Sequence, residues 1–241
     1  ISKQYQNMLK PTMGINNNHL TTLMAWFSPG FPVGGFAYSH GLETAIESGI
    51  VDDKSSLTEW LKGALFFGSP NNDALILKEI YEATIKRDCV LLKDVSNLAL
   101  TLNVASELTD ESIVQGNAFW RVIRSAWPHN DFSSLQKHLP KNKIVYPVAV
   151  AIAAAKHDIP ILESLLAYLQ AFVMNGVSAG IRLGLIGQTD GQIIIEELQS
   201  SIFQSANRSI VSSIDQLGTA TLMIDLMSIK HETQTTRLFR S

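Results

Sequence analysis

The sequence is poor in cysteine and in charge. Its single cysteine, Cys89, excludes an internal disulfide and a zinc site built from several cysteines, and it fits a reducing compartment. Charged residues make up only 17% of the 241 residues, and the net charge is −3. This balance argues against strong nucleic-acid binding. The first residues do not form a charged and then apolar secretory leader, so we expect a cytoplasmic protein.

Patterns that bind metals or phosphates are also missing. None of the six histidines forms His-x-x-x-His or lies in a His/Cys cluster, which argues against a preformed metal site. A two-fold interface could still bring two copies of one histidine to a metal ion. Gly30 and Gly35 have the glycine spacing of a phosphate loop, but Phe36 stands where that loop needs lysine. The dinucleotide fingerprint Gly-x-Gly-x-x-Gly is absent as well.

No segment shows the alternation of a β-strand, and no repeat or long linker divides the chain. Hydrophobic residues make up 46% of the sequence, enough for a sizeable core. We predict a single-domain, all-α orthogonal bundle of roughly ten helices. Its expected parts are a flexible leader over residues 1–20, a helical domain over 21–215 and an extended C-terminal tail over 216–241.

One uncharged stretch, Ser164 to Ile181, approaches the roughly 20 residues that cross a bilayer. It contains Gln170 and Asn175, and a helix that is apolar on all sides can be the central helix of a soluble protein. We therefore expect no membrane contact. Gly176 and Gly180 lie four residues apart in this stretch, a spacing that lets a second helix approach closely.

Helix starts are predicted from capping residues. Ser56 with Glu59, and Thr189 with Gln192, have the spacing of a capping box. The remaining predicted starts are Asn72 or Asp73, Thr109, and Pro147 in a first turn.

The segment from Ser28 to Glu43 differs from the helical remainder. It reads Ser-Pro-Gly-Phe-Pro-Val-Gly-Gly-Phe-Ala-Tyr-Ser-His-Gly-Leu-Glu. Its prolines interrupt helices, and its glycines permit backbone angles and close contacts that a Cβ would prevent. The simplest interpretation is a packed turn that leads into a helix. We call this segment the glycine-rich turn.

Two catalytic interpretations of this turn are weak. Ser39 and its neighbours approach the Gly-x-Ser-x-Gly elbow of hydrolases, but that motif needs a preceding strand and an α/β sheet. Ser39 and His40 are also adjacent in sequence, which makes a nucleophile–base hydrogen bond difficult. Glu43 and Glu47 lie one helical turn apart and could act as an acid/base pair, although a solvated acidic face is the simpler interpretation.

Three segments resemble one family. The run Phe-Pro-Val-Gly-Gly-Phe-Ala-Tyr-Ser-His-Gly-Leu-Glu is similar to the N-terminal signature of the urease accessory protein UreF family. Arg182 to Gln188 resembles the family pattern Arg/Lys-Leu-x-Pro-Leu-Gly-Gln, with Leu185 in place of proline. The end of the chain, from Lys230 to Ser241, resembles the family's closing Arg-His-Glu-Thr-Gln-x-x-Arg-Leu-Phe-Arg-Ser, with lysine in place of the first arginine.

The resemblance implies a non-enzymatic assembly factor for nickel urease. Such a protein binds the accessory protein UreD (also called UreH) and the GTPase UreG, acts as a homodimer in the complex, and helps to deliver nickel to apo-urease. Nickel and GTP are then handled by the partners, and the chain needs no cofactor of its own. Two alternatives stay open: a helical hydrolase that uses Ser39 and His40, and a metallochaperone that binds nickel directly.

The resemblance also implies which residues contact partners. The signature positions and Arg182 would form or support the surface that faces UreG, and the tail would contact UreD. The expected partner-binding residues are Pro32, Gly34, Gly35, Ser39, His40, Glu43, Arg182, Gln188, Lys230, His231, Glu232, Arg237, Leu238, Phe239 and Arg240. Arg182 is the only charge between Glu163 and Asp190, so an internal ion pair and an interface role are both reasonable for it. If the chain supplies an arginine to the GTPase, Arg182 is the first candidate, followed by Arg121 and Arg124.

Overall fold

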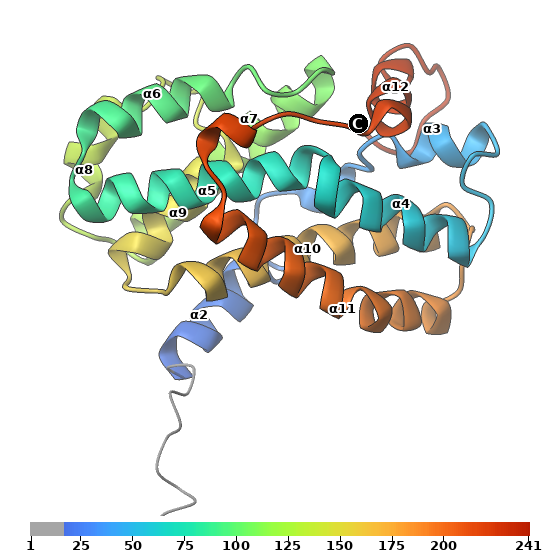
Figure 1. Ribbon diagram of the computed structural model, residues 1–241, viewed down its shortest axis with the longest axis horizontal. Helices are drawn as coiled ribbons and strands as arrows, with labels where there is room; N and C mark the ends of the chain where they lie inside the picture. The colour runs from blue at the N-terminus through green and yellow to red at the C-terminus, as the bar shows by residue number, and fades with distance from the viewer. Residues whose placement is uncertain (1–16) are drawn as a thin grey trace, which may run out of the picture.

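The computed structural model describes residues 17–241, and every regular element in that range is helical. The predicted all-α, single-domain bundle of roughly ten helices is therefore confirmed (Figure 1). The elements are α2 (Asn17–Trp26), η1 (Gly35–Ala37), α3 (Leu42–Glu47), α4 (Lys54–Phe67), α5 (Ser69–Lys86), α6 (Cys89–Ala99), α7 (Ser106–Ala126), α8 (Phe132–Leu135), η2 (Gln136–His138), α9 (Tyr146–Lys156), α10 (Ile161–Arg182), α11 (Gln188–Val211), η3 (Ile214–Gln216) and α12 (Leu222–His231).

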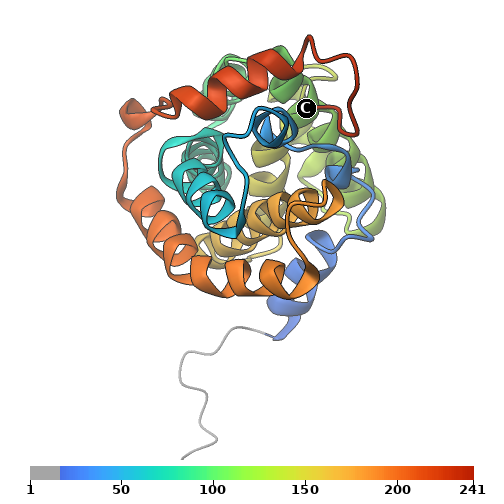
Figure 2. The same ribbon diagram turned by 90° about the vertical axis from the view of Figure 1, so that its right-hand side faces the viewer.

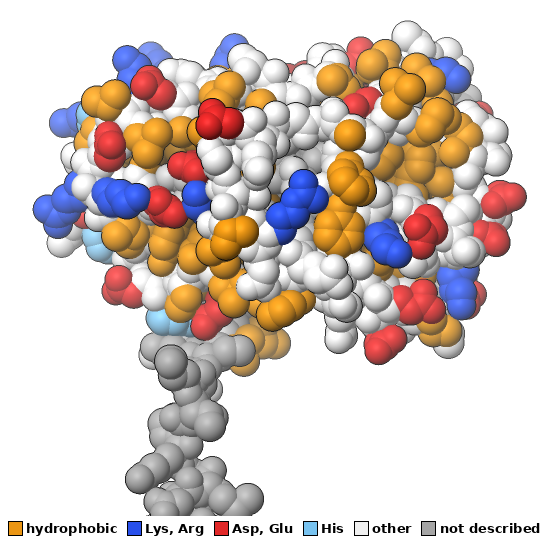
Figure 3. Space-filling model, in the orientation of Figure 1, with side chains coloured by type: hydrophobic (Ala, Val, Ile, Leu, Met, Phe, Trp, Pro, Cys, Tyr) orange, Lys and Arg blue, Asp and Glu red, His pale blue; other side chains and the backbone are white. Residues whose placement is uncertain are grey.

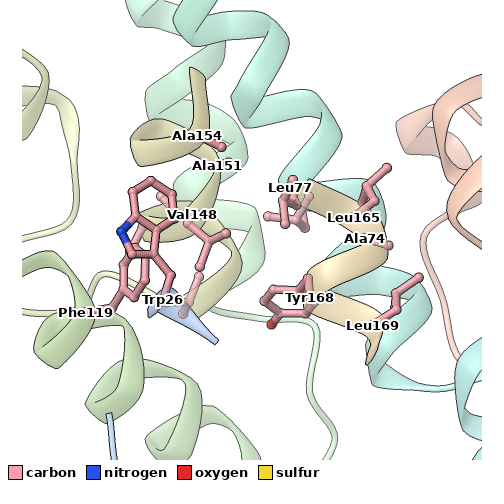
Figure 4. Packing of buried hydrophobic residues seen from close by; sticks show 14 of the residues in the cluster. Trp26, Ala74, Leu77, Phe119, Val148, Ala151, Ala154, Leu165, Tyr168 and Leu169 are labelled. Atoms are coloured by element: carbon pink, nitrogen blue, oxygen red, sulfur yellow. The ribbon is translucent and has the colours of Figure 1, made fainter. Parts of the chain in front are cut away.

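The core is built around α5 and α9. All residues of α9 from Pro147 to Ala155 are buried, and its many alanines let α5 and α7 pack closely against it. Figure 4 shows this packing, with Trp26 of α2 beside Phe119 of α7 and Val148 of α9. The rings of Trp26 and Phe119 meet edge to face at 5.6 Å, an arrangement that aromatic pairs prefer. The first described helix is thereby joined to the centre of the molecule.

The apolar helix α10 packs inside the bundle, against α11, α5 and α4. A Cβ at Gly176 would lie 2.5 Å from Cδ2 of Leu61, and one at Gly180 would lie 2.8 Å from Cδ2 of Leu57. The predicted close approach of a second helix is confirmed, and α4 is that helix. In the described part of the chain α10 alone is long and apolar enough to cross a membrane, and half of its apolar window is buried. That burial is typical of a core helix.

Several helices begin earlier than their capping residues predicted. The cap of α4 is Asp53, whose carboxylate accepts from the Ser56 backbone N–H at 2.7 Å, so Ser56 is the third helical residue and not the cap. Helix α7 begins three residues before Thr109, and α11 begins at Gln188, ahead of Thr189. Helix α5 likewise begins at Ser69, before the predicted Asn72 or Asp73. The starts of α5, α7 and α11 have no side-chain cap, and tertiary packing supplies the free energy that lets these helices extend past the predicted caps.

The structure describes the C-terminal region in full and only the last residues of the expected leader. Residues 17–20 belong to α2, and the rest of the expected leader lies outside the described residues. The C-terminal region forms η3 and α12, and the last residues return to the start of α3 (Figures 1 and 2). The chain end is therefore packed against the body of the bundle.

Candidate functional site at the glycine-rich turn and the C-terminal segment

The structure brings two of the three family-like segments into direct backbone contact. We call residues 232–241 the C-terminal segment. The backbone N–H of Ser39 donates to the carbonyl oxygen of Ser241 at 2.7 Å, and the Ser39 hydroxyl donates to the same oxygen at 2.5 Å. The backbone N–H of Arg240 donates to the carbonyl oxygen of Ala37 at 2.8 Å. The end of the chain therefore lies alongside the glycine-rich turn.

Glycine is required at Gly41 for this arrangement. Gly41 has a φ of +73° and precedes α3. A Cβ there would lie 2.7 Å from the backbone nitrogen of Ser228 in α12. The neighbouring His40 also has a positive φ, +54°, which is uncommon for a residue with a side chain. The chain thus reverses sharply at this point so that α3 and α12 can pack together.

Glu43 is the main anchor of the C-terminal segment. Its two carboxylate oxygens accept from the backbone N–H groups of Leu238 at 2.6 Å and Phe239 at 2.9 Å. His231 lies 3.2 Å from the same carboxylate. Glu43 is only 7% exposed, so the prediction that Glu43 and Glu47 form a solvated acidic face is wrong for Glu43. Glu47 is exposed, as that prediction requires. Charge-assisted hydrogen bonds of this kind are about twice as strong as neutral ones.

Two glutamates of α7 hold the segment from its other side. Glu107 lies between His231 Nδ1, at 2.7 Å, and the Arg237 guanidinium, at 2.5 Å. Glu111 accepts from the Ser241 hydroxyl at 2.7 Å. Sequence reasoning missed both residues as site members, and it placed the start of α7 after Glu107. Their spacing of four residues on one helix face is the signal that could have identified them.

His40 joins the turn to the same cluster. Its Nε2 atom lies 3.1 Å from Glu111, which also accepts from the Gln115 side chain at 2.7 Å. Burial lowers the pKa of His40, but the Glu111 carboxylate more than offsets this and leaves that pKa raised. The Ser39 hydroxyl is engaged by Ser241 and receives the Glu43 backbone N–H at 3.3 Å. Ser39 and His40 therefore have separate partners, which argues against a nucleophile–base pair.

Arg182 brings the end of α10 to the site. Its guanidinium lies over the ring of Phe239, 4.4 Å from the ring centroid, and donates to the carbonyl oxygen of Phe36. A cation above an aromatic face is attracted by the ring. Among the described residues Arg182 forms no ion pair, so the internal ion pair considered for it is not found there. Arg182 instead clamps the C-terminal segment against the glycine-rich turn.

The other predicted site residues divide into supporting and peripheral positions. Glu232 accepts from the backbone N–H and hydroxyl of Ser106, at 2.7 and 2.8 Å, and so binds the start of α7. Gly34 and Gly35 line a cavity beneath the turn. Pro32, Gln188, Lys230, Leu238 and Arg240 are exposed. Gln188 begins α11 and forms no hydrogen bond with the described residues of the turn or the C-terminal segment.

No group of three or more His, Cys, Asp or Glu residues within residues 17–241 could hold a metal ion. Carboxylates and histidines in the cluster bind backbone groups and each other. The arrangement is therefore a structural anchor for the C-terminal segment, which leaves one face of that segment and of α12 at the surface. Leu222 of α12 and Leu238 of the C-terminal segment are 79% and 55% exposed.

Comparison with known proteins gives one consistent match. The UreF family profile matches residues 51–199, more than half of the chain. "Urease accessory protein UreF" of Azorhizobium caulinodans is 43% identical over 219 residues, which cover 91% of this chain and 94% of the relative. The protein of the same name from Agrobacterium fabrum is 44% identical over 222 residues, covering 92% and 96%. That from Bradyrhizobium diazoefficiens is 41% identical over 222 residues, covering 92% and 91%.

Proposed function

The chain belongs to the UreF family of urease accessory proteins and acts in urease maturation, and from this premise we propose that it is a non-catalytic assembly factor that binds UreD and recruits the GTPase UreG. In this proposal the chain works in the cytoplasm as a homodimer, and the complex inserts nickel into apo-urease. Nickel and GTP are handled by the partners.

The observation that carries this proposal is the anchored C-terminal segment. Phe239 and Ser241 are 3% and 2% exposed, and three buried or half-buried glutamates hold the segment in place. A segment held in this way is ordered before a partner arrives, so binding costs less conformational entropy than it would for a free tail. Order of this kind in a peripheral segment favours a docking function.

The surface beside the segment is apolar. Helix α12 exposes Leu222, Met223, Leu226 and Ile229 at 79%, 44%, 39% and 45%, which form a stripe at helical spacing. Figure 3 shows hydrophobic side chains gathered over the region where Figure 1 places α12. Contiguous exposed apolar surface marks protein interaction sites. We assign this stripe, together with Leu238, to the contact with UreD.

The UreD contact can be tested without disturbing the anchor. A double variant, Leu222→Ser with Leu238→Ser, removes two exposed apolar side chains and keeps every backbone hydrogen bond of the segment. We expect at least tenfold weaker co-purification with UreD from the same organism, because a few central residues dominate most interfaces. Val211→Ser is the matched control, since Val211 is 84% exposed at the end of α11. Undiminished binding by the double variant would contradict the assignment.

The chain could change GTP hydrolysis by UreG in either of two directions. It could activate hydrolysis, or it could restrain hydrolysis until nickel is loaded. Arg182 already contacts Phe239 and the carbonyl of Phe36, so it would have to leave both to reach a nucleotide. Arg121 and Arg124 are exposed, and Arg124 donates to the Gln136 side chain. The geometry therefore favours a supporting role for Arg182 over a role as an arginine supplied to the GTPase.

Single-turnover GTP hydrolysis by UreG tests the arginine idea. We expect the chain to change the UreG rate, and we expect Arg121→Ala to reduce that change more than Arg182→Ala does when UreD binding is intact. The direction of the wild-type effect distinguishes activation from restraint. If the wild-type chain leaves the rate of GTP hydrolysis by UreG unchanged, GTPase regulation is removed from the proposal.

A further inference from the structure

A cavity of about 440 Å³ lies beneath the glycine-rich turn, and its wall is rich in aromatic rings. The rings belong to Trp26, Phe27, Phe31, Tyr146, Tyr168 and Phe172. This volume falls within the range of small-molecule sites, about 300–1,000 Å³. The cavity is separate from the exposed stripe of α12, so the docking surface described above does not account for it.

Two buried polar atoms at this cavity lack partners, the Nε1 atom of Trp26 and the Nδ1 atom of His40. Asp73, which is half-buried, lines the same cavity, and its Oδ2 atom accepts from the Tyr168 hydroxyl at 2.7 Å. The Nε2 atom of His40 contacts Glu111. Buried polar atoms are nearly always hydrogen-bonded. Asp73 and the two unpartnered nitrogens line the same cavity, so one ligand could contact all three.

Glu111 is not available in the same way. Its oxygens already face His40, Gln115 and the Ser241 hydroxyl. It nevertheless adds a second negative charge at the cavity wall. An anionic ligand would be repelled by Asp73 and Glu111. A bare metal ion would find fewer than the three protein ligands that a site usually supplies, since the described residues form no such group.

The remaining ligand chemistry is a cation on an apolar stem. The ring faces of the wall attract a positive charge and pack against methylene groups. A guanidinium group carries several donors in one plane, so it could donate to the Asp73 carboxylate. An ammonium group could donate to the same carboxylate from a single nitrogen.

We propose that this cavity is a binding site for an alkylguanidinium or alkylammonium group, with Asp73 as the charge partner and the aromatic wall around the stem. The group can come from a free small molecule or from an arginine or lysine side chain of a partner protein. Phe36 and Met174 also line the cavity and are 66% and 44% exposed, so they form an apolar rim on which a partner could rest. The site is a property of the chain alone and does not depend on the proposed function.

Isothermal titration of the purified chain tests the proposal. The probe is butylguanidinium, and butylurea is its neutral counterpart of nearly equal shape. We expect butylguanidinium to bind at least tenfold more tightly than butylurea, a difference of about 1.4 kcal/mol. This comparison needs no variant. Equal affinity for the two probes, or no heat at about 10 mM probe, would overturn the proposal.

A variant pair locates the site. Asp73→Asn keeps an acceptor for Tyr168 and removes the charge, so we expect at least a tenfold loss of butylguanidinium affinity. Asp94→Asn, at an exposed position of α6, is the control and should bind as the wild type does. Unchanged binding by Asp73→Asn would show that the probe binds elsewhere, and would overturn the assignment to this cavity.

A third ligand distinguishes the two sources of the cation, a free small molecule and a side chain of a partner protein. An acetylated, amidated tripeptide with arginine between two leucines adds apolar contacts for the rim at Phe36 and Met174. Tighter binding of the peptide than of butylguanidinium assigns the site to a partner's side chain. Tighter binding of free butylguanidinium assigns it to a small molecule, and either result supports the shared chemistry.

Discussion

At the scale of single residues, acidic side chains decide how the site is built. Glu43 and Glu107 act on the C-terminal segment through hydrogen bonds to Leu238, Phe239 and Arg237. Removing such a carboxylate would leave buried N–H groups without acceptors, which costs about 1–3 kcal/mol for each group. The importance of Glu43 could be predicted only from the family resemblance. Its local sequence also suits a solvated helix face, and burial of a carboxylate depends on partners almost 200 residues away.

Asp73 is expected to oppose folding at neutral pH. Burial raises its pKa to about 6, although the Tyr168 hydrogen bond and the nearby His40 act to lower it and Glu111 to raise it. The folded chain therefore binds more protons than the unfolded chain between pH values of about 3.8 and 6. Stability from this group falls as the pH rises through that window. Asp73→Asn should then be more stable than the wild type at pH 7.5, by about 1–3 kcal/mol.

Urea unfolding at two pH values measures this effect. The advantage of Asp73→Asn should shrink toward zero near pH 4, where Asp73 is protonated in the folded wild type. The Asp73 charge helps to raise the pKa of His40, so the measured difference belongs to the pair and not to Asp73 alone. Asp94→Asn, which is exposed, should match the wild type at both pH values. An advantage of the same size at pH 4 and pH 7.5 would show that the charge of Asp73 is not its cause.

At the scale of helices and turns, the sequence predicted helix packing better than it predicted where helices begin. The spacing of Gly176 and Gly180 predicted a close helix approach, because glycine is the only residue that leaves room for one. The spacing of Ser56 and Glu59 misplaced a helix start, because Asp53 is a competing cap three residues earlier. Local capping rules compare a few neighbours, whereas each helix end also depends on the elements packed against it.

For the turn and the C-terminal segment, too, the sequence predicted one feature and not another. Each could be identified as unusual from its own residues, the turn by its glycines and prolines and the segment by its arginines and phenylalanine. Their contact could not, because Ser39 and Ser241 lie 202 residues apart and no local pattern reports such a pairing. The cavity was equally out of reach, since Asp73 and His40 meet only after α5 has packed beside the turn.

At the scale of the whole molecule, the ends of four helices, α3, α7, α10 and α12, meet the chain terminus in one cluster. Helix α7 supplies Glu107 and Glu111, α10 supplies Arg182, and α12 leads into the C-terminal segment. A change at any of these places is expected to loosen the segment as a unit, because the contacts share their partners. Buried residues of the cluster are therefore expected to control binding at an exposed surface to which their own side chains do not contribute.

The affinity of the chain for UreD, measured for Glu43→Ala and Glu47→Ala, tests this claim most directly. Glu43 is buried and anchors Leu238 and Phe239, whereas Glu47 is exposed one helical turn away. With helix content verified by circular dichroism, we predict at least tenfold weaker UreD binding for Glu43→Ala and wild-type binding for Glu47→Ala. Wild-type affinity in a folded Glu43→Ala protein would contradict the account.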